Sequence, residues 1–151
     1  MYKILRINTR TQEYRFEEMG DLAGLGGRAL TSRIISAEVP PTCHPLSAYN
    51  KVVIAGGVLA GTRAANSGRV SVGCKSPLTG GIKESNSGGQ FAQTLPKLGL
   101  IAIVFEDKPE DGAPLSTVFI SEDKVEFHDA ASITGMDTDR KSTRLNSSHY
   151  S

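Results

Sequence analysis

The stretch Ala55–Gln90, AGGVLAGTRAANSGRVSVGCKSPLTGGIKESNSGGQ, holds nine of the sixteen glycines in the chain. Glycine is favoured where the backbone needs a positive φ or must come close to another group. Asn86-Ser87-Gly88-Gly89 reads as a turn that precedes a helical pattern, and free backbone N–H groups at such a turn bind anions. We therefore predict a backbone cradle for an anionic ligand, with positive charge added by Arg69 and Lys75.

Two plainer interpretations of the same stretch stay open. The chain contains no GxxxxGK[ST] motif, and Gly80-Gly81 and Gly88-Gly89 lack the spacing of GxGxxG. On the pattern alone, glycines that serve tight turns of a structural β-rich domain would be the better explanation. A non-catalytic β-rich module that binds a phosphate-containing ligand is the second alternative.

Composition limits the classes of function. The chain has 151 residues, 38% of them hydrophobic and 22% charged, with a formal net charge of +1, as in ordinary globular domains. Nucleic-acid binding would call for a clustered basic face, and no apolar run approaches the about 20 residues of a membrane-spanning helix. We see no signal peptide at the start. Because Cys43 and Cys74 form no CxxC pair, we expect reduced thiols in a cytoplasmic protein.

Strands dominate the pattern along the chain. Period-2 alternation and short β-branched runs predict strands over Tyr2–Asn8, Glu13–Glu17, Lys51–Ala55, Arg69–Lys75, Leu100–Phe105, Ser116–Ser121 and Val125–His128. Helical spacing predicts one helix over Arg28–Glu38 and a second after Gly89, the latter burying Phe91, Leu95 and Leu98. The result is a β-rich α+β class with two short helices, and no linker divides the chain.

The sequence shows no group of residues typical of a catalytic site. His44 and His128 have no partner at metal-ligand spacing, and Ser76 and Thr79 have no base or oxyanion site near them in the sequence. The residues alone therefore favour binding over catalysis.

The last residues do not continue the domain pattern. DRKSTRLNSSH, Asp139–His149, has no apolar period and resembles the translation of a common sequencing-adapter oligonucleotide. We expect residues 139–151 to be a disordered, adapter-derived tail, and the natural reading frame to continue with other residues.

Six motifs follow one another in a specific order. They are YKILRIN (2–8), LGGRAL (25–30), HPLSAYNKVVIAGGVLAGT (44–62), SGRVSVGCKSPLTGG (67–81), ESNSGGQF (84–91) and LGLIAIVFEDKPEDG (98–112). In this order they resemble the N-terminal domain of the aldehyde ferredoxin oxidoreductase family, and KSPLTG followed closely by NSGG is specific for it. The resemblance covers residues 1–138, which we expect to form a partial pterin-cofactor-binding domain.

The resemblance implies both a fold and a site. In this family two β-sheets form a base for a tungsten or molybdenum ion held by two pterins, so the chain would be an incomplete two-sheet β platform. Arg69, Asn86 and Gly88 match the residues that contact the pterin cofactor. Asn86 would also offer its backbone carbonyl to the Mg²⁺ that bridges the pterin phosphates, a ligand type that Mg²⁺ prefers.

The resemblance also implies an activity for the intact protein. The family oxidises an aldehyde with water to a carboxylate and passes two electrons through a [4Fe–4S] cluster to ferredoxin. Some relatives act on sugar-phosphate aldehydes or reduce aromatic thioesters, which leaves the substrate open. Cys43 and Cys74 do not match the cluster ligands, so the fragment alone is expected to be inactive. Ferredoxin and an aldehyde are the expected partners, not nucleic acid or a membrane.

The chain departs from the family pattern at a few positions. The usual Thr-Gly turn reads Thr11-Gln12, and Ala29 replaces a glycine of the LGGRGL-like segment. The second change predicts a difference in a close-packed loop.

Overall fold

The chain divides into two compact units, residues 1–109 and 110–151. The structure is a computed structural model that describes residues 2–122 and 124–137, so the predicted tail, residues 139–151, lies outside the described part. The prediction that no linker divides the chain was wrong. The division falls in the polar segment EDKPEDGAP, whose charged, Gly and Pro residues favour solvent over a core.

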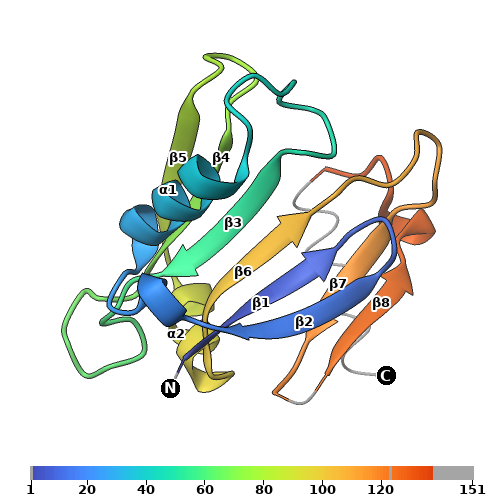
Figure 1. Cartoon of the computed structure of the whole chain (residues 1–151). Helices are drawn as coiled ribbons and strands as arrows, with labels where there is room; N and C mark the ends of the chain where they lie inside the picture. The colour runs from blue at the N-terminus through green and yellow to red at the C-terminus, as the bar shows by residue number, and fades with distance from the viewer. Residues whose placement is uncertain (1, 123, 138–151) are drawn as a thin grey trace. The chain divides into compact units, whose positions relative to one another are not determined.

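The first unit is built on a mixed six-stranded sheet in the order β2-β1-β6-β3-β4-β5 (Figure 1). Its strands are β1 (Lys3–Asn8), β2 (Glu13–Glu18), β3 (Lys51–Gly56), β4 (Arg69–Lys75), β5 (Ile82–Gly88) and β6 (Leu100–Glu106). β1 and β6 pair in parallel, and the other neighbours pair antiparallel. With two helices and a second, two-stranded sheet, the architecture confirms the predicted β-rich α+β class with two sheets.

Helix α1 (Gly27–Glu38) packs across β3 and β4 (Figure 1). Its apolar face buries Leu30, Ile34 and Ile35 against side chains of the central strands, including Val53 and Val104. Because each of these side chains is almost fully removed from water, burial stabilises the unit by roughly 1.5–3 kcal/mol per residue. The helix is therefore held firmly on one face of the sheet, and its first turn has a fixed place beside β4.

Two glycines allow α1 to approach the sheet closely. A Cβ at Gly73 would lie 2.7 Å from the Thr31 Cβ, and a Cβ at Gly26 would lie 2.8 Å from the Val58 backbone nitrogen. Ala29, in contrast, is an exposed helix residue. The expected change in a close-packed loop is therefore not found at position 29, because the tight contact is made by Gly26.

Helix α2 (Gln90–Lys97) follows β5 and contacts β6, β3 and β4. It buries Ala92 and Leu95, whereas Phe91 is 51% exposed. The prediction that Phe91 belongs to the buried face was wrong, because the helix begins at Gln90 and directs Ala92 toward the sheet instead. Pro96 lies in the last turn and the helix ends one residue later, as a proline near a helix end predicts.

β5 is the main correction to the sequence prediction. Residues 86–88 do not form a turn, because they belong to β5, which pairs with β4 along its whole length. Its sequence IKESNSG is exposed at almost every position. An edge strand with two solvated faces lacks the apolar alternation from which strands are recognised.

The opening hairpin joins β1 to β2 through a tight polar turn. The Asn8 Oδ1 accepts hydrogen bonds from the backbone N–H groups of Arg10 (2.9 Å) and Thr11 (3.0 Å), which is an Asx-type turn. Gln12 has a φ of +57°, a conformation that favours glycine. The replacement of the family's glycine at this position thus falls where the backbone is left-handed. A short 3₁₀ helix, η1 (Gly20–Leu22), follows β2.

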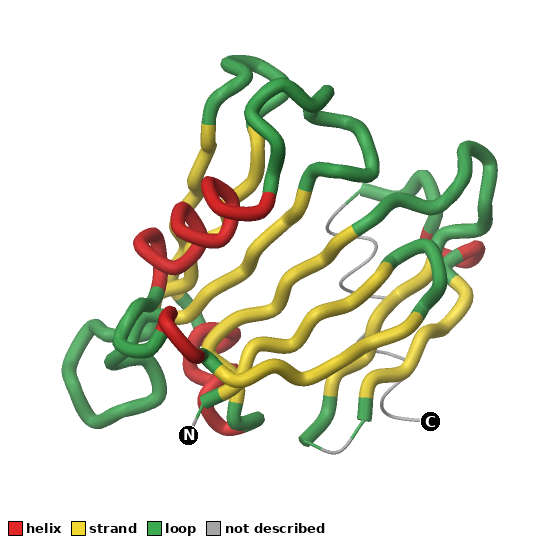
Figure 2. Tube along the Cα trace, viewed as in Figure 1, coloured by secondary structure: helices red, strands yellow, loops and turns green. Residues whose placement is uncertain are grey.

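The second unit contains a β-hairpin of β7 (Ser116–Ile120) and β8 (Val125–Asp129), followed by the 3₁₀ helix η2 (Ala131–Ile133) (Figure 2). Ser121 N–H donates to the Lys124 carbonyl at 2.9 Å and closes the hairpin. The hairpin that the sequence predicted around residues 122 and 123 is confirmed.

Candidate functional site

The three predicted site residues lie together on the paired strands β4 and β5. Arg69 is directly opposite Gly88, and Ser71 is directly opposite Asn86. Side chains of directly opposed residues share one face of a sheet and are close neighbours. The missing side chain at Gly88 therefore leaves room beside the Arg69 guanidinium, whose Nη1 would lie 3.7 Å from a Cβ at that position.

The backbone groups of Asn86 and Gly88 face the outer edge of β5. Gly57 N–H donates to the Arg69 carbonyl at 3.3 Å, so the Arg69 carbonyl and, two residues on, the N–H and C=O groups of Ser71 point toward β3. Their partners on β5 are then non-hydrogen-bonded pairs, whose own N–H and C=O groups point away from β4. Since β5 ends the sheet, these groups are presented to whatever lies beside it.

A chain of hydrogen bonds connects the three polar side chains. The Arg69 Nε donates to the Asn86 Oδ1, and the Asn86 Nδ2 donates to the Ser71 Oγ at 3.2 Å. Among the described residues the terminal guanidinium nitrogens of Arg69 have no further hydrogen-bond partner. Arg69 is thus held at Nε and offers its two terminal nitrogens, the pair that binds a phosphate or carboxylate in bidentate fashion.

These side chains border a hollow of about 390 Å³ between the start of α1 and the ends of β4 and β5. It is lined by Gly27, Arg28, Gly57, Asn66, Ser67, Arg69, Ser71, Glu84 and Asn86. The residue before the helix, Gly26, has no side chain that could cap the first turn, and such a turn carries unpaired N–H groups and a partial positive charge. The hollow therefore combines two arginines with an uncapped helix start, an arrangement that suits an anion.

The structure differs from the sequence prediction in which helix start lies at the anion cradle. The sequence placed the helix N-terminus of the cradle before α2, whereas the helix that opens into the hollow is α1. Arg28 and Ser71 were missed as site residues. LGGRAL was the available signal for Arg28, but no local pattern shows that its segment meets β4.

Lys75 does not contribute charge to the hollow. Its side chain is buried, at 7% exposure, and its Nζ donates to the Pro41 carbonyl. The prediction for Lys75 was therefore wrong. Strand alternation places Lys75 on the same face as Arg69, but at the opposite end of β4, where it fastens the segment that follows α1.

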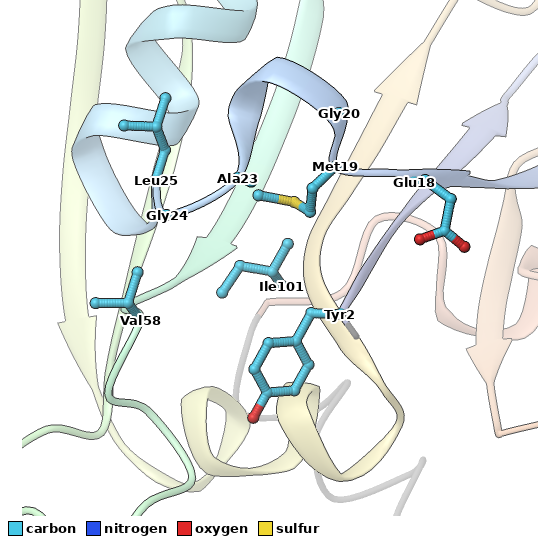
Figure 3. Close-up of a pocket in the computed structure, with 9 residues that line it drawn as sticks. All are labelled: Tyr2, Glu18, Met19, Gly20, Ala23, Gly24, Leu25, Val58 and Ile101. Atoms are coloured by element: carbon cyan, nitrogen blue, oxygen red, sulfur yellow. The ribbon is translucent and has the colours of Figure 1, made fainter.

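A second hollow in the first unit is larger and chemically different. It has a volume of about 580 Å³, and apolar side chains such as Met19, Ile101 and Val58 dominate its lining (Figure 3). Tyr2 contributes its ring, and Glu18 belongs to the lining at one side. Polar groups do not converge there, so this hollow offers no chemistry for an anionic cofactor.

The remaining candidates stay outside the site. His44 is exposed and accepts the Leu46 N–H at 3.2 Å, and His128 lies 3.7 Å from Glu126 in the second unit. Cys43 and Cys74 are free thiols. In residues 2–122 and 124–137 there is no group of three or more His, Cys, Asp or Glu that would hold a metal ion. In the same part of the chain, none of the helices has the length and apolar content that crossing a membrane requires.

Comparison with known proteins gives the family. The model for the aldehyde ferredoxin oxidoreductase N-terminal domain matches residues 4–151. The chain belongs to this family. It is 39% identical over 136 residues to a tungsten-containing aldehyde ferredoxin oxidoreductase of Pyrococcus furiosus, covering 88% of this chain and 22% of that protein. A protein of the same name from Thermococcus kodakarensis is 38% identical with the same coverage.

A solved structure supports the same membership. The chain is similar, with a TM-score of 0.89 and 27% identity, to a chain of the active-site complex BamBC of benzoyl-coenzyme A reductase. The match covers 98% of this aldehyde ferredoxin oxidoreductase domain and 23% of that chain. The domain thus spans about a fifth of the length of the relatives that it matches.

Proposed function

We propose that this domain forms one part of the platform that binds a tungsten- or molybdenum-bispterin cofactor, with Arg69, Asn86 and Gly88 in contact with it. The observation that carries the proposal is the arrangement of the three residues. Among the described residues Arg69 has a hydrogen-bond partner at Nε and none at its terminal nitrogens, while the backbone groups of Asn86 and Gly88 lie at the sheet edge. Tungsten in the names of the relatives supports the metal.

The donor set of the hollow fits the phosphate end of a pterin cofactor. Arg69 and Arg28 supply positive charge, the start of α1 supplies N–H groups, and the Asn66–Ser67 pair adds polar groups at the rim. The cofactor itself would supply the redox chemistry at its metal. The residues of this chain bind its anionic end, fix its orientation and hold it against the sheet.

The Asn86 carbonyl is our candidate ligand for Mg²⁺. It points away from β4, since Ser71 and Asn86 form a non-hydrogen-bonded pair, so pairing within the sheet does not consume it. A backbone carbonyl is an oxygen ligand of the kind that Mg²⁺ takes, usually beside phosphate oxygens and water. The carbonyl would help to hold Mg²⁺, whose positive charge would offset part of the negative charge of the cofactor phosphates without a dedicated carboxylate cage.

For the complete protein we propose oxidation of an aldehyde to a carboxylate, with the added oxygen taken from water and two electrons leaving through a [4Fe–4S] cluster to ferredoxin. The higher identity to tungsten-containing aldehyde ferredoxin oxidoreductases, 39% against 27% for the benzoyl-coenzyme A reductase chain, supports an aldehyde over an aromatic thioester. A non-catalytic phosphate-binding module would use the same hollow, but it would carry no metal.

Metal and pterin content of the complete protein tests the proposal. Arg69→Ala and Asn86→Ala should each lower tungsten or molybdenum and pterin per mole of purified protein at least several-fold, because a charge-assisted hydrogen bond is lost from the cradle. Arg33→Ala, an exposed arginine of α1 outside the hollow, is the matched control and should keep the full content. Unchanged content in Arg69→Ala and Asn86→Ala together would refute the platform assignment.

A further inference from the structure

Ser71 lies under the hollow at a position where its hydroxyl group has little contact with solvent. It is 2% exposed, although its neighbour in the site, Arg69, is exposed. α1 begins directly over it, since a Cβ at Gly27 would lie 3.6 Å from the Ser71 Oγ. Ser71 therefore lines the floor of the hollow from β4, with the first residue of α1 above it.

The polarity of the hydrogen-bond chain follows from the chemistry of Arg69. A guanidinium group only donates, so the atom of the Asn86 amide that faces Arg69 must be the acceptor Oδ1. The amide nitrogen then faces the Ser71 Oγ, at 3.2 Å, and the hydroxyl oxygen is the acceptor there. With an apolar side chain at position 71, the inner end of the amide would lose this partner.

We infer that Ser71 is a positioning residue of the cofactor site, which sets the orientation of the Asn86 amide and, through it, the direction of the Arg69 guanidinium. The inference rests on the proposed function. Ser71 itself acts through Asn86, because the buried hydroxyl is covered by that amide and by the start of α1. Asn86 then holds the Arg69 Nε, which leaves both terminal nitrogens directed to an anion.

If Ser71 positions Asn86, the affinity of the site for an anion should depend on the Ser71 hydroxyl group. Ser71→Ala removes the acceptor without adding volume, so the Asn86 amide gains freedom to rotate and Arg69 loses its fixed partner. Inorganic pyrophosphate, titrated into cofactor-free complete protein by calorimetry, is the probe. We expect its Kd to rise about five-fold in Ser71→Ala, the loss that one hydrogen bond predicts, while Ser71→Thr, which keeps a hydroxyl, recovers most of the affinity.

A double-mutant cycle of Ser71 and Asn86 distinguishes a positioning role of Ser71 from a general effect on the stability of the fold. Ser71→Ala should have no further effect on the Kd in an Asn86→Ala background, because Ser71 would act only through that amide. Its thermal midpoint should stay near that of Ser36→Ala, a control that removes an exposed α1 hydroxyl outside the hollow. Additive losses in the double variant, or weaker binding that follows a lower thermal midpoint, would overturn the inference.

The same titrations distinguish the inference from the proposed function. If Arg69→Ala and Asn86→Ala weaken pyrophosphate binding while Ser71→Ala does not, the positioning role fails and the platform stands. If neither Arg69→Ala nor Asn86→Ala changes binding or cofactor content, the platform fails and the role of Ser71 fails with it.

Discussion

Glu84 lines the same hollow as Arg28 and Arg69. A negative charge a few ångströms from a bound anion opposes binding by about 1 kcal/mol at a partly solvated site. We therefore predict that Glu84→Gln strengthens pyrophosphate binding to the cofactor-free protein about two- to five-fold. Calorimetric titration at low and high salt measures the effect, which salt should reduce.

The control for this charge change is Glu13→Gln, on the edge strand β2 at the opposite side of the sheet. It removes the same formal charge far from β5 in the strand order. Equal gains in both variants would mean that net charge, rather than the position of Glu84, governs the affinity.

At the scale of residues, the family motifs select Arg69, Asn86 and Gly88 as site candidates, and the structure places the three together on paired strands, while their contact with a cofactor stays a prediction. The sequence could not predict that Ser71 and Arg28 line the same hollow, since the hollow forms between segments far apart in the chain. Lys75 is the opposite case, a residue that the sequence suggested for the site and that the structure places outside it. Its charge suited an anion site, but only the pairing of β4 with β5 shows that Asn86 and Gly88 lie at the Arg69 end of β4, away from Lys75.

At the scale of elements, Gly73 of β4 and Gly88 of β5 have different roles. Gly73 allows α1 to pack closely on the sheet, whereas we expect Gly88 to leave room for a ligand. A Cβ at Gly73 would meet the Thr31 Cβ at 2.7 Å, whereas a Cβ at Gly88 would have ordinary contacts, the nearest at 3.7 Å. We predict that Gly73→Ala destabilises the fold by about 1–3 kcal/mol, because α1 must move off the sheet. Gly88→Ala should leave stability within about 0.5 kcal/mol and instead lower the cofactor content of the complete protein.

Urea denaturation and metal analysis of both variants measure the two effects. A Gly88→Ala protein with its full tungsten or molybdenum content would show that the cofactor does not approach this backbone. A Gly73→Ala protein as stable as the parent would show that α1 has room to shift.

The strands differ in how far their sequences reveal them. The predicted bounds of β4 agree with the structure, because Val70 and Val72 alternate with polar residues in a half-buried strand. β5 was missed, since its residues are exposed on an edge and its small polar side chains are typical of turns. The register of β4 with β5, which assembles the site, depends on this missed strand.

A buried ion-pair network ties five elements together at the other end of α1. Arg6 of β1, 5% exposed, bonds Glu17 of β2 and Glu38 of α1, the latter at 2.6 Å. Lys51 of β3 lies 2.9 Å from Glu38 and 2.8 Å from Glu106 of β6. The hydrogen bond from Arg6, followed by that from Lys51, lowers the pKa of Glu38 from 4.5 to about 2.

This lowered pKa gives stability a predictable dependence on pH. Because the folded pKa lies below the unfolded one, Glu38 contributes stability that is fully present above pH 4.5 and is lost as the pH falls toward 2. We predict that Glu38→Gln destabilises the fold by about 1–2 kcal/mol at neutral pH, and that the difference vanishes near pH 2. Urea midpoints of the two proteins across pH 2–7 measure it, and a difference that persists at pH 2 would contradict the charge-based origin.

At the scale of the whole molecule, the described residues bring together candidate binding residues but no group of side chains that would hold a metal ion. The 151-residue sequence has two cysteines, both free thiols, whereas a [4Fe–4S] cluster takes four thiolate ligands. The relatives that it matches are more than four times as long, since the matched region is 22% of their length. A cluster of this kind would therefore need cysteines beyond the two of this chain.

We predict that the 151-residue chain, purified alone, does not reduce a viologen dye when an aldehyde is added, whereas the complete protein does. The hollow of about 390 Å³ presents donors for one anionic end of a cofactor, and a bispterin cofactor has two such ends. Without a second binding surface and a cluster, electrons removed from an aldehyde would have no route to the dye. Anaerobic dye assays on both proteins, with metal analysis of each, measure this, and aldehyde-dependent dye reduction by the 151-residue chain would show that the domain is an enzyme in its own right.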